Sequence, residues 1–235
     1  MALSAVIFDR DGTLIDFDAT WGPVFANMLY GLTDGDEIAA DKAAKASGFD
    51  LKNKVFLTGS PIKVQTPKDY SVIWAAALDE EFTDAFVARV EELLLQNAGI
   101  AVTPFKDTLK VIHVLSEMGV PIGLATNGTE ASARMQLEAL GVLQYFDFVA
   151  GYDSGYGAKP EAGQLLAFAK AFGLQPEDIA MVGDSLHDIH AANAAGMVGI
   201  GLTTGAMTAE QLEADSDYVY DALEGILPHF TAKNA

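Results

Sequence analysis

The sequence predicts an α/β fold: a parallel sheet covered by helices, with a second, helical domain inserted after the first strand. Short apolar runs alternate with helical patterns from residue 100 onward, which is typical of a parallel sheet covered on both faces. Residues 17–99 break this alternation and are rich in helical patterns. Half of the 235 residues are hydrophobic, which is enough for a large buried core.

The first predicted strand is the apolar run SAVIFD at residues 4–9. Because it precedes the insertion, it must pair with strands more than a hundred residues away. We therefore assign residues 1–16 and 100–235 to one core domain. Further strands are predicted at 120–126, 146–150, 178–183 and 196–202, and helices at 105–118, 129–140, 161–172 and 185–195.

The insertion at residues 17–99 is predicted to be a helical domain. One helix carries apolar residues on a single face, and a second helix is expected at 81–97. Residues 47–71, between these helices, are rich in Gly, Pro, Ser and Thr and are predicted to be loop-like. The residues expected on the buried faces are Trp21, Phe25, Met28 and Leu29 in the first helix, and Phe82, Phe86, Val90, Leu93 and Leu94 in the second.

Composition narrows the class of protein. A net charge of −19 repels nucleic acid and anionic membranes, so we expect neither as a partner. There is no apolar run of membrane-spanning length and no secretory pattern at the N-terminus. The absence of cysteine excludes disulfides and thiolate metal sites. We expect a cytoplasmic protein, either a monomer or a homodimer.

Polar residues gather where the predicted strands end. In open parallel sheets, ligands bind at the carboxyl ends of the strands. The first strand ends in Asp9, Arg10 and Asp11, although two carboxylates two residues apart on an extended chain point to the same side and repel. Other strands and loops at this edge contribute Thr126, Asn127, Gly128, Lys159, Asp184 and Asp188.

This residue set suits a phosphoryl group and a hard divalent cation. Mg²⁺ prefers oxygen ligands, so Asp9, Asp184 and Asp188 are sensible ligands, and the cation would relieve the repulsion between carboxylates. One carboxylate could attack phosphorus while a second moves the proton. Lys159 supplies positive charge.

The end of the strand at 120–126 supplies further donors for a phosphoryl group. The Thr126 hydroxyl can donate to a phosphoryl oxygen, as can backbone N–H groups at the start of the next helix. We therefore place Thr126 with the catalytic residues, and Asn127 and Gly128 with the substrate-binding residues.

Four motifs follow one another along the chain: DRDGT at 9–13, Thr126-Asn127 after a strand, Lys159-Pro160, and GDSLHD at 183–188. Each motif alone is a weak signal, whereas the set is highly specific. With this set, the whole chain resembles the haloacid dehalogenase superfamily of phosphohydrolases, and most closely its phosphoglycolate phosphatase-like branch. The resemblance implies a Rossmann-like core with a helical cap after the first motif.

The resemblance also implies a role for each motif residue. Asp9 would be the nucleophile and Asp11 the general acid/base. Mg²⁺ would be bound by the carboxylates of Asp9 and Asp184 and by the backbone carbonyl of Asp11. Asp188 would assist directly, through water, or by orienting Lys159.

Position 10 departs from the pattern, because this branch usually has an apolar residue there. Either Arg10 points toward the substrate phosphate, or its stem packs aside while its head reaches water. We favour the first and place Arg10 among the substrate-binding residues.

The predicted function is Mg²⁺-dependent hydrolysis of a small phosphorylated metabolite, phosphoglycolate or a similar phosphomonoester, through an aspartyl phosphate. A β-phosphoglucomutase-like mutase would also retain Asp11, and its product would be a phosphorylated sugar. A phosphonate hydrolase typically lacks this aspartate. A phospho-aspartate receiver domain is a non-enzymatic alternative, but such domains are about half as long and lack a cap that could enclose a substrate.

One lysine-rich stretch stands out in the acidic chain. Residues 41–68 contain six lysines against two aspartates, a local excess of four positive charges. A solvated face explains this as well as a functional role does. The functional hypothesis is that the lysines attract an anionic substrate, with Lys63 contacting its far end.

Overall fold

The computed structural model describes residues 2–57, 59–63, 66–205 and 207–231. The chain divides into two compact units. The sheet unit is formed by Met1–Asp16 and Thr103–Ala235, and the helical unit by Phe17–Val102. That the helical unit serves as a cap for a catalytic core stays a prediction.

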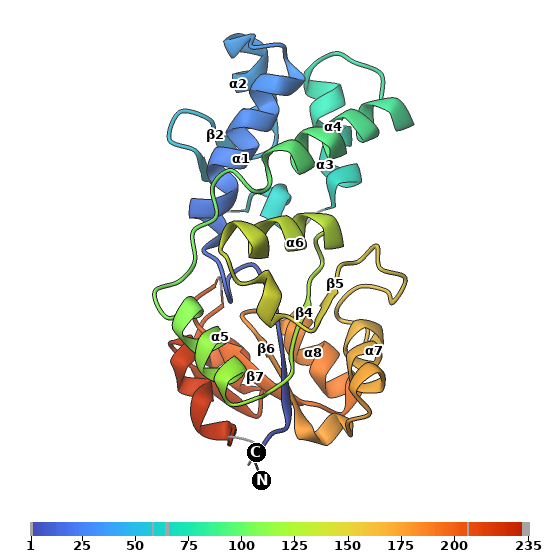
Figure 1. Ribbon diagram of the computed structural model, residues 1–235. Coiled ribbons are helices and arrows are strands. Elements are labelled where there is room, and N and C mark those ends of the chain that lie inside the picture. Colours follow the sequence, from blue (N-terminus) through green and yellow to red (C-terminus); the bar gives the residue numbers. More distant parts are fainter. Residues whose placement is uncertain (1, 58, 64–65, 206, 232–235) are drawn as a thin grey trace. The chain divides into compact units, whose positions relative to one another are not determined.

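The sheet unit contains a six-stranded sheet in the order β5-β4-β1-β6-β7-β8, and every strand pair in it is parallel. This confirms the predicted fold class, a parallel α/β sheet of Rossmann-like type. The first strand lies inside the sheet between two strands from the second half of the chain (Figure 1). The strands are β1 (Ala5–Phe8), β4 (Ile122–Ala125), β5 (Phe148–Ala150), β6 (Ile179–Gly183), β7 (Val198–Leu202) and β8 (Tyr218–Tyr220).

Strand β1 occupies the place where the strand order reverses. Val6 is paired with Ile122 of β4 on one side and with Ala180 of β6 on the other. All four β1 residues are fully buried, which requires packing on both faces of the sheet. In open α/β sheets, the carboxyl edge at such a switch point is where ligands bind.

Helices cover the sheet and complete its core. Ile7 of β1 packs in one apolar cluster with Phe168 of α7 and Ala191 of α8, and α5 contacts β4. The helices of the sheet unit are α5 (Thr108–Glu117), α6 (Glu130–Ala139), α7 (Gly163–Phe172), α8 (Leu186–Ala195) and α9 (Ala209–Glu213), with 3₁₀ helices η2 (Leu143–Tyr145), η3 (Pro176–Asp178) and η4 (Leu223–His229).

Two details of this unit differ from the prediction. Strand β8 was not predicted, because it is a three-residue edge strand whose side chains are only partly buried. The helix predicted at 161–172 begins slightly later, because α7 starts at Gly163. Pro160 lies in the loop that precedes α7, and its peptide bond with Lys159 is cis.

The helical unit has its own aromatic core. Phe25 contacts Phe49, Phe56, Tyr70 and Trp74 with ring centroids 5.3–6.5 Å apart. The elements of this unit are α1 (Phe17–Leu32), α2 (Glu37–Ala46), α3 (Pro67–Ala77) and α4 (Asp84–Asn97), the antiparallel hairpin β2 (Phe49–Asp50) and β3 (Val55–Phe56), and η1 (Pro61–Lys63).

The prediction for this unit needs two corrections. The loop-like stretch 47–71 contains the β2–β3 hairpin and the first residues of α3, which is capped by Thr66. Phe82 is 43% exposed because α4 begins only at Asp84. The other residues expected on the buried faces are buried or pack against the core.

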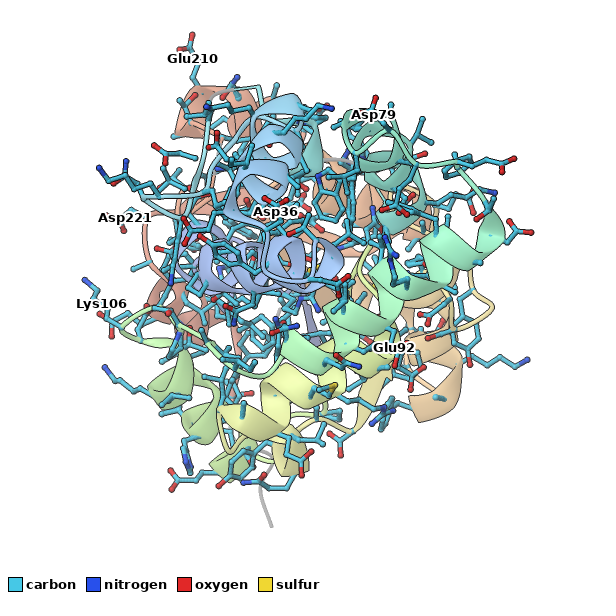
Figure 2. All side chains as sticks on the ribbon, turned by 90° about the horizontal axis from the view of Figure 1, so that it is seen from above. Asp36, Asp79, Glu92, Lys106, Glu210 and Asp221 are labelled. Carbon is cyan, nitrogen blue, oxygen red and sulfur yellow. The ribbon has the colours of Figure 1, made fainter. Side chains whose placement is uncertain are left out.

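The acidic charge lies largely at the surface. Figure 2 shows labelled charged side chains such as Glu210 and Lys106 extending outward from the ribbon. Such a distribution fits solvation of the protein rather than a ligand site. Within the described residues, no helix is both long and apolar enough to span a bilayer.

Candidate active site

A bend at Arg10 separates the two aspartates of the first motif. The Asp9 N–H donates to the Val182 carbonyl at 2.8 Å, so sheet pairing continues one residue beyond β1. The chain then reverses, and the Arg10 carbonyl accepts from the N–H groups of Leu14 (2.9 Å) and Ile15 (3.1 Å). This corrects the premise of an extended Asp9–Asp11 pair. The two carboxylates have different partners.

Lys159 is the centre of a buried ion cluster. Its Nζ donates to Asp9 Oδ1 and to Asp188 Oδ1, both at 2.6 Å. The Lys159 side chain is 3% exposed and that of Asp188 is 1% exposed. The second oxygen of Asp188 accepts from the N–H and hydroxyl of Ser185, which closes a capping box at the start of α8. One carboxylate therefore orients the lysine and stabilises a helix end.

The charges in this cluster perturb one another. Burial raises the pKa of Asp9 to about 7, against the opposing effect of Lys159 and with support from Asp188 and Asp11. Burial also raises the pKa of Asp184 to about 8, with repulsion from Asp9 and Asp188 adding to it. Burial alone would lower the pKa of Lys159, but the carboxylates of Asp188 and Asp9 more than offset this and raise it. The raised pKa favours the charged form of this lysine.

Asp9, Asp184 and Asp188 can each offer an oxygen within 4.8 Å of the others, a spacing that can hold a metal ion. Asp184 lies against the backbones of Gly12 and Gly205, where any side chain would overlap its carboxylate. Gly12 also has a φ of +79°, which favours glycine. These two glycines make room for the carboxylate at this edge of the sheet.

The end of β4 contributes Thr126 and Asn127. The Thr126 hydroxyl accepts from the Gly128 N–H at 3.0 Å, so its own hydrogen can still be donated to a ligand. The Asn127 side chain forms two hydrogen bonds with the backbone of Lys159, both at 2.8 Å. The Asn127 side chain thus positions Lys159. The predicted contact of Asn127 with substrate would then be made by the Asn127 backbone N–H.

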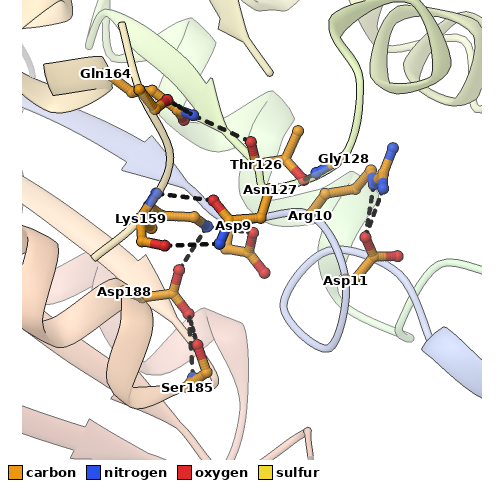
Figure 3. A network of polar contacts seen from close by, with 11 residues as sticks. Asp9, Arg10, Asp11, Thr126, Asn127, Gly128, Lys159, Gln164, Ser185 and Asp188 are labelled. Carbon is orange, nitrogen blue, oxygen red and sulfur yellow. Dashed lines mark hydrogen bonds and ion pairs between the residues drawn. The ribbon is translucent and has the colours of Figure 1, made fainter. Parts of the chain in front are cut away.

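Arg10 and Asp11 form a separate pair. Arg10 Nε and Nη2 donate to Asp11 Oδ2 at 2.9 and 2.7 Å, and Nη1 donates to Ser132 Oγ at 3.0 Å. The whole Arg10 side chain is only 4% exposed, which contradicts the alternative in which its head reaches water. Figure 3 shows the guanidinium turned toward Asp11, on the side of Asp9 opposite to Lys159.

Three further positioning residues were not singled out from the sequence. The Gln164 amide is buried and donates to the carbonyls of Thr126 (3.2 Å) and Gly157 (2.9 Å), joining two loops of the site. The Thr204 hydroxyl donates to the Gly12 carbonyl at 2.6 Å. The third is Ser132, which accepts from Arg10. Among the three, only Gln164 had a signal in the sequence, because it is a polar residue within the apolar helix sequence GQLLAFAKAF.

Lys63 belongs to the helical unit. Its Nζ pairs with Asp18 at 2.8 Å and lies 5.5 and 5.8 Å from the ring centroids of Phe17 and Phe56. This lysine is thus held in one orientation within its unit. Its predicted contact with substrate stays a prediction.

Comparison with known proteins identifies the family. The family model for haloacid dehalogenase-like hydrolases matches residues 3–196. "Probable phosphatase IndB" of Dickeya dadantii is 31% identical over 215 residues, covering 89% of this chain and 85% of that protein. "Phosphoglycolate phosphatase" of Salmonella typhimurium is 28% identical over 242 residues, covering 96% and 92%. A solved structure described as a predicted phosphoglycolate phosphatase, from Haemophilus somnus, has a TM-score of 0.71, 22% identity, and coverage of 96% and 97%.

Fold and site define an α/β enzyme whose carboxylates and lysine meet at a sheet edge, and the chain belongs to the haloacid dehalogenase-like hydrolases. It is a phosphatase-type enzyme of this family and is similar to phosphoglycolate phosphatases. This argues against the receiver-domain alternative.

Proposed function

We propose that the chain is a Mg²⁺-dependent phosphatase that hydrolyses a small phosphorylated metabolite through an aspartyl phosphate on Asp9. The observation that carries the proposal is the buried contact of Lys159 with Asp9 and Asp188 at the carboxyl edge of the sheet. Burial disfavours the ionised form of a carboxylate, and a nearby cation favours it. A nucleophilic Asp9 must be ionised in its buried site, and Lys159 supplies the cation that favours this form.

The reaction divides between two carboxylates. An Asp9 oxygen attacks phosphorus and forms an acyl phosphate, while the bond from phosphorus to the leaving oxygen breaks. Asp11 gives its proton to that leaving oxygen, so the product departs as an alcohol and not as an alkoxide. Asp11 then takes a proton from the water that attacks the acyl phosphate. Inorganic phosphate leaves and the Asp9 carboxylate is restored.

Lys159 and Thr126 stabilise the negative charge on the phosphoryl group during both steps. The Lys159 ammonium donates to Asp9 Oδ1, so it lies beside any phosphoryl group that is bonded to this oxygen. Thr126 accepts a backbone N–H and can donate its hydroxyl hydrogen outward. Fixed donors of this kind are worth several kcal/mol in a water-poor site, about 3–4 kcal/mol for one donor in comparable enzymes.

The donor set fits Mg²⁺. Four carboxylates, on Asp9, Asp11, Asp184 and Asp188, face one ammonium and one guanidinium. Burial raises the pKa values of Asp9 and Asp184, and repulsion from neighbouring carboxylates adds to this rise. Oxygen donors without cysteine or histidine select a hard cation. The carboxylates of Asp9 and Asp184 and the Asp11 carbonyl would hold it, with Asp188 nearby. When bound, the cation neutralises charge on the phosphoryl oxygens.

The substrate class we propose is a small phosphomonoester, with phosphoglycolate as the first candidate. The similarity to the Salmonella phosphoglycolate phosphatase over 96% of the chain supports this choice. The net charge of −19 argues against a nucleic-acid substrate. The absence of cysteine fits action in a reducing cytoplasm.

The test is phosphate release from a panel of phosphorylated metabolites, with Mg²⁺ or with EDTA. We expect strong release from one compound by the wild-type protein with Mg²⁺, and none from Asp9→Asn, which keeps the shape but loses the nucleophile. Asp41→Asn is the matched control, because Asp41 pairs with Lys45 on an exposed helix face. Undiminished release by Asp9→Asn would contradict the proposed nucleophile.

The presence of Asp11 also fits a second candidate function, a sugar-phosphate mutase. Asp11 is retained, and a sugar-phosphate mutase also needs an acid/base at this position. The same panel separates the two, since a mutase would convert a sugar phosphate into an isomer without releasing phosphate in proportion.

A further inference from the structure

Arg10 joins the proposed acid/base to the rest of the sheet unit. Its guanidinium makes two hydrogen bonds to a single oxygen of Asp11, at 2.7 and 2.9 Å. The remaining nitrogen donates to Ser132 Oγ on α6 at 3.0 Å. Asp11 is thereby tied to a helix that begins 119 residues later in the chain, at Glu130.

The surroundings of Arg10 are shaped for this position. A Cβ on Gly128 would lie 2.5 Å from Arg10 Nη2, so a glycine is needed there for the guanidinium to fit. Ser132 Oγ is itself directed by its hydrogen bond to the Thr129 carbonyl at 3.0 Å. The Arg10 backbone carbonyl accepts from Leu14 and Ile15, which fixes the base of the side chain.

The two cations of the site have separate tasks. Lys159 contacts Asp9 and Asp188, whereas Arg10 contacts Asp11. Figure 3 shows the Arg10 guanidinium on the opposite side of Asp9 from Lys159 and directed at Asp11. A residue that captured the substrate phosphate would be directed at the oxygen of Asp9 that attacks phosphorus. Arg10 is directed elsewhere.

We infer that Arg10 is a positioning residue, which holds the Asp11 carboxylate where it exchanges a proton with the leaving group. The Asp11 side chain is 23% exposed. Two charge-assisted hydrogen bonds from the guanidinium favour one orientation of this carboxylate before substrate arrives. This inference rests on the proposed phosphatase function and replaces phosphate binding as the role of Arg10.

The inference predicts a dependence on the leaving group. An alkyl phosphate needs protonation of its leaving oxygen, whereas 4-nitrophenyl phosphate releases a stable phenolate and needs little. General acids contribute about 10²–10⁴-fold, so Arg10→Met should lower kcat/KM for an alkyl phosphate by about 10–100-fold and for the aryl phosphate by less than about threefold. The ratio kcat/KM is used because it covers the steps up to departure of the leaving group.

A double-mutant cycle separates positioning from other roles. In an Asp11→Asn background, Arg10→Met should have no further effect on the alkyl phosphate. Ser132→Ala should give a smaller loss with the same dependence on the leaving group, and it keeps the charges of the site. Arg134→Met is the matched control, because Arg134 pairs with Glu130 on the exposed side of the same helix.

The outcomes are distinct. If Arg10→Met raises KM equally for both substrates, and does so also in the Asp11→Asn background, Arg10 binds phosphate and the inference is wrong. If kcat/KM falls equally for both substrates at unchanged KM, the effect is general disruption, and the inference is again wrong. If the wild-type protein hydrolyses neither substrate, the proposed phosphatase function fails first.

Discussion

The buried ion pairs at the sheet edge contrast with the exposed ion pairs of the helical unit. In the sheet unit, Lys159, Asp9 and Asp188 are paired with side chains that are at most 10% exposed. In the helical unit, Lys42–Asp79 and Lys45–Asp41 are paired with side chains at least 48% exposed. Exposed pairs stabilise a fold by about 0–1 kcal/mol, whereas breaking a buried pair costs about 3–5 kcal/mol. The difference indicates that the buried pairs of Lys159 with Asp9 and Asp188 are the ones that matter for catalysis.

The largest effect is expected from Lys159→Met. It leaves the Asp9 and Asp188 carboxylates buried without their cation, so we expect a loss of about 3–5 kcal/mol in the free energy of unfolding, together with loss of activity. Urea unfolding monitored by circular dichroism measures the change. The matched variant Lys42→Met should change stability by less than about 1 kcal/mol. Equal losses in both variants would remove the contrast between the units.

A second large effect is expected from pH in the absence of metal. The pKa values of Asp9 and Asp184 rise from an ordinary 3.8 to about 7 and about 8, so the folded state holds these protons more tightly than the unfolded state. Their contribution to stability is full below pH 3.8 and is lost as pH rises through about 7 and 8. With EDTA, we therefore expect Tm to fall between pH 6 and pH 9.

Two comparisons test the cause of this pH dependence. Adding Mg²⁺ at pH 9 should raise Tm, because a bound cation replaces the lost protons. In Asp184→Asn, the fall with pH in EDTA should be smaller, since one of the two titrating groups is gone. A fall of the same size in Asp184→Asn would assign the pH dependence to the surface charge instead.

An intermediate effect is expected from Asn127→Ala. This change removes two hydrogen bonds to the Lys159 backbone, each worth about 1 kcal/mol, so unfolding should become easier by about 2 kcal/mol. We expect kcat to fall while KM changes little, because the lysine loses its exact placement beside Asp9 rather than its charge. A rise in KM alone would indicate that Asn127 contacts the substrate instead.

The smallest effect on stability is expected from Lys63→Met. Its pair with Asp18 is partly exposed, so stability should change by less than about 1 kcal/mol. If the helical unit recognises the far end of a doubly anionic substrate, KM should rise several-fold. Lys68→Met, an exposed lysine of the same unit, is the control. An unchanged KM in Lys63→Met would remove Lys63 from the substrate-binding set.

Much of the sheet unit could be predicted from the sequence. The runs around Ile7, Leu124 and Met181 are continuous and apolar, which leaves a doubly covered parallel strand as their natural structure. Strand β8 could not be predicted in this way. Tyr218–Tyr220 is short and only partly buried at a sheet edge, so it carries no such signal.

The residues of the candidate site could be predicted more easily than their partners. Asp9, Thr126 and Asp184 follow strands directly, so topology alone gathers them at one edge. The direction of each side chain depends on tertiary packing. No spacing in the sequence indicates that Arg10 contacts Asp11 and Ser132, or that the Asn127 amide faces the backbone of Lys159.

Asp188 has a consequence for engineering this protein. Active-site charges usually reduce stability, so replacing them commonly yields a sturdier, inactive protein. Replacing Asp188 should not raise stability, because one of its oxygens contacts Lys159 while the other caps the first turn of α8. A screen for thermostable variants should therefore retain Asp188 even when activity is not selected.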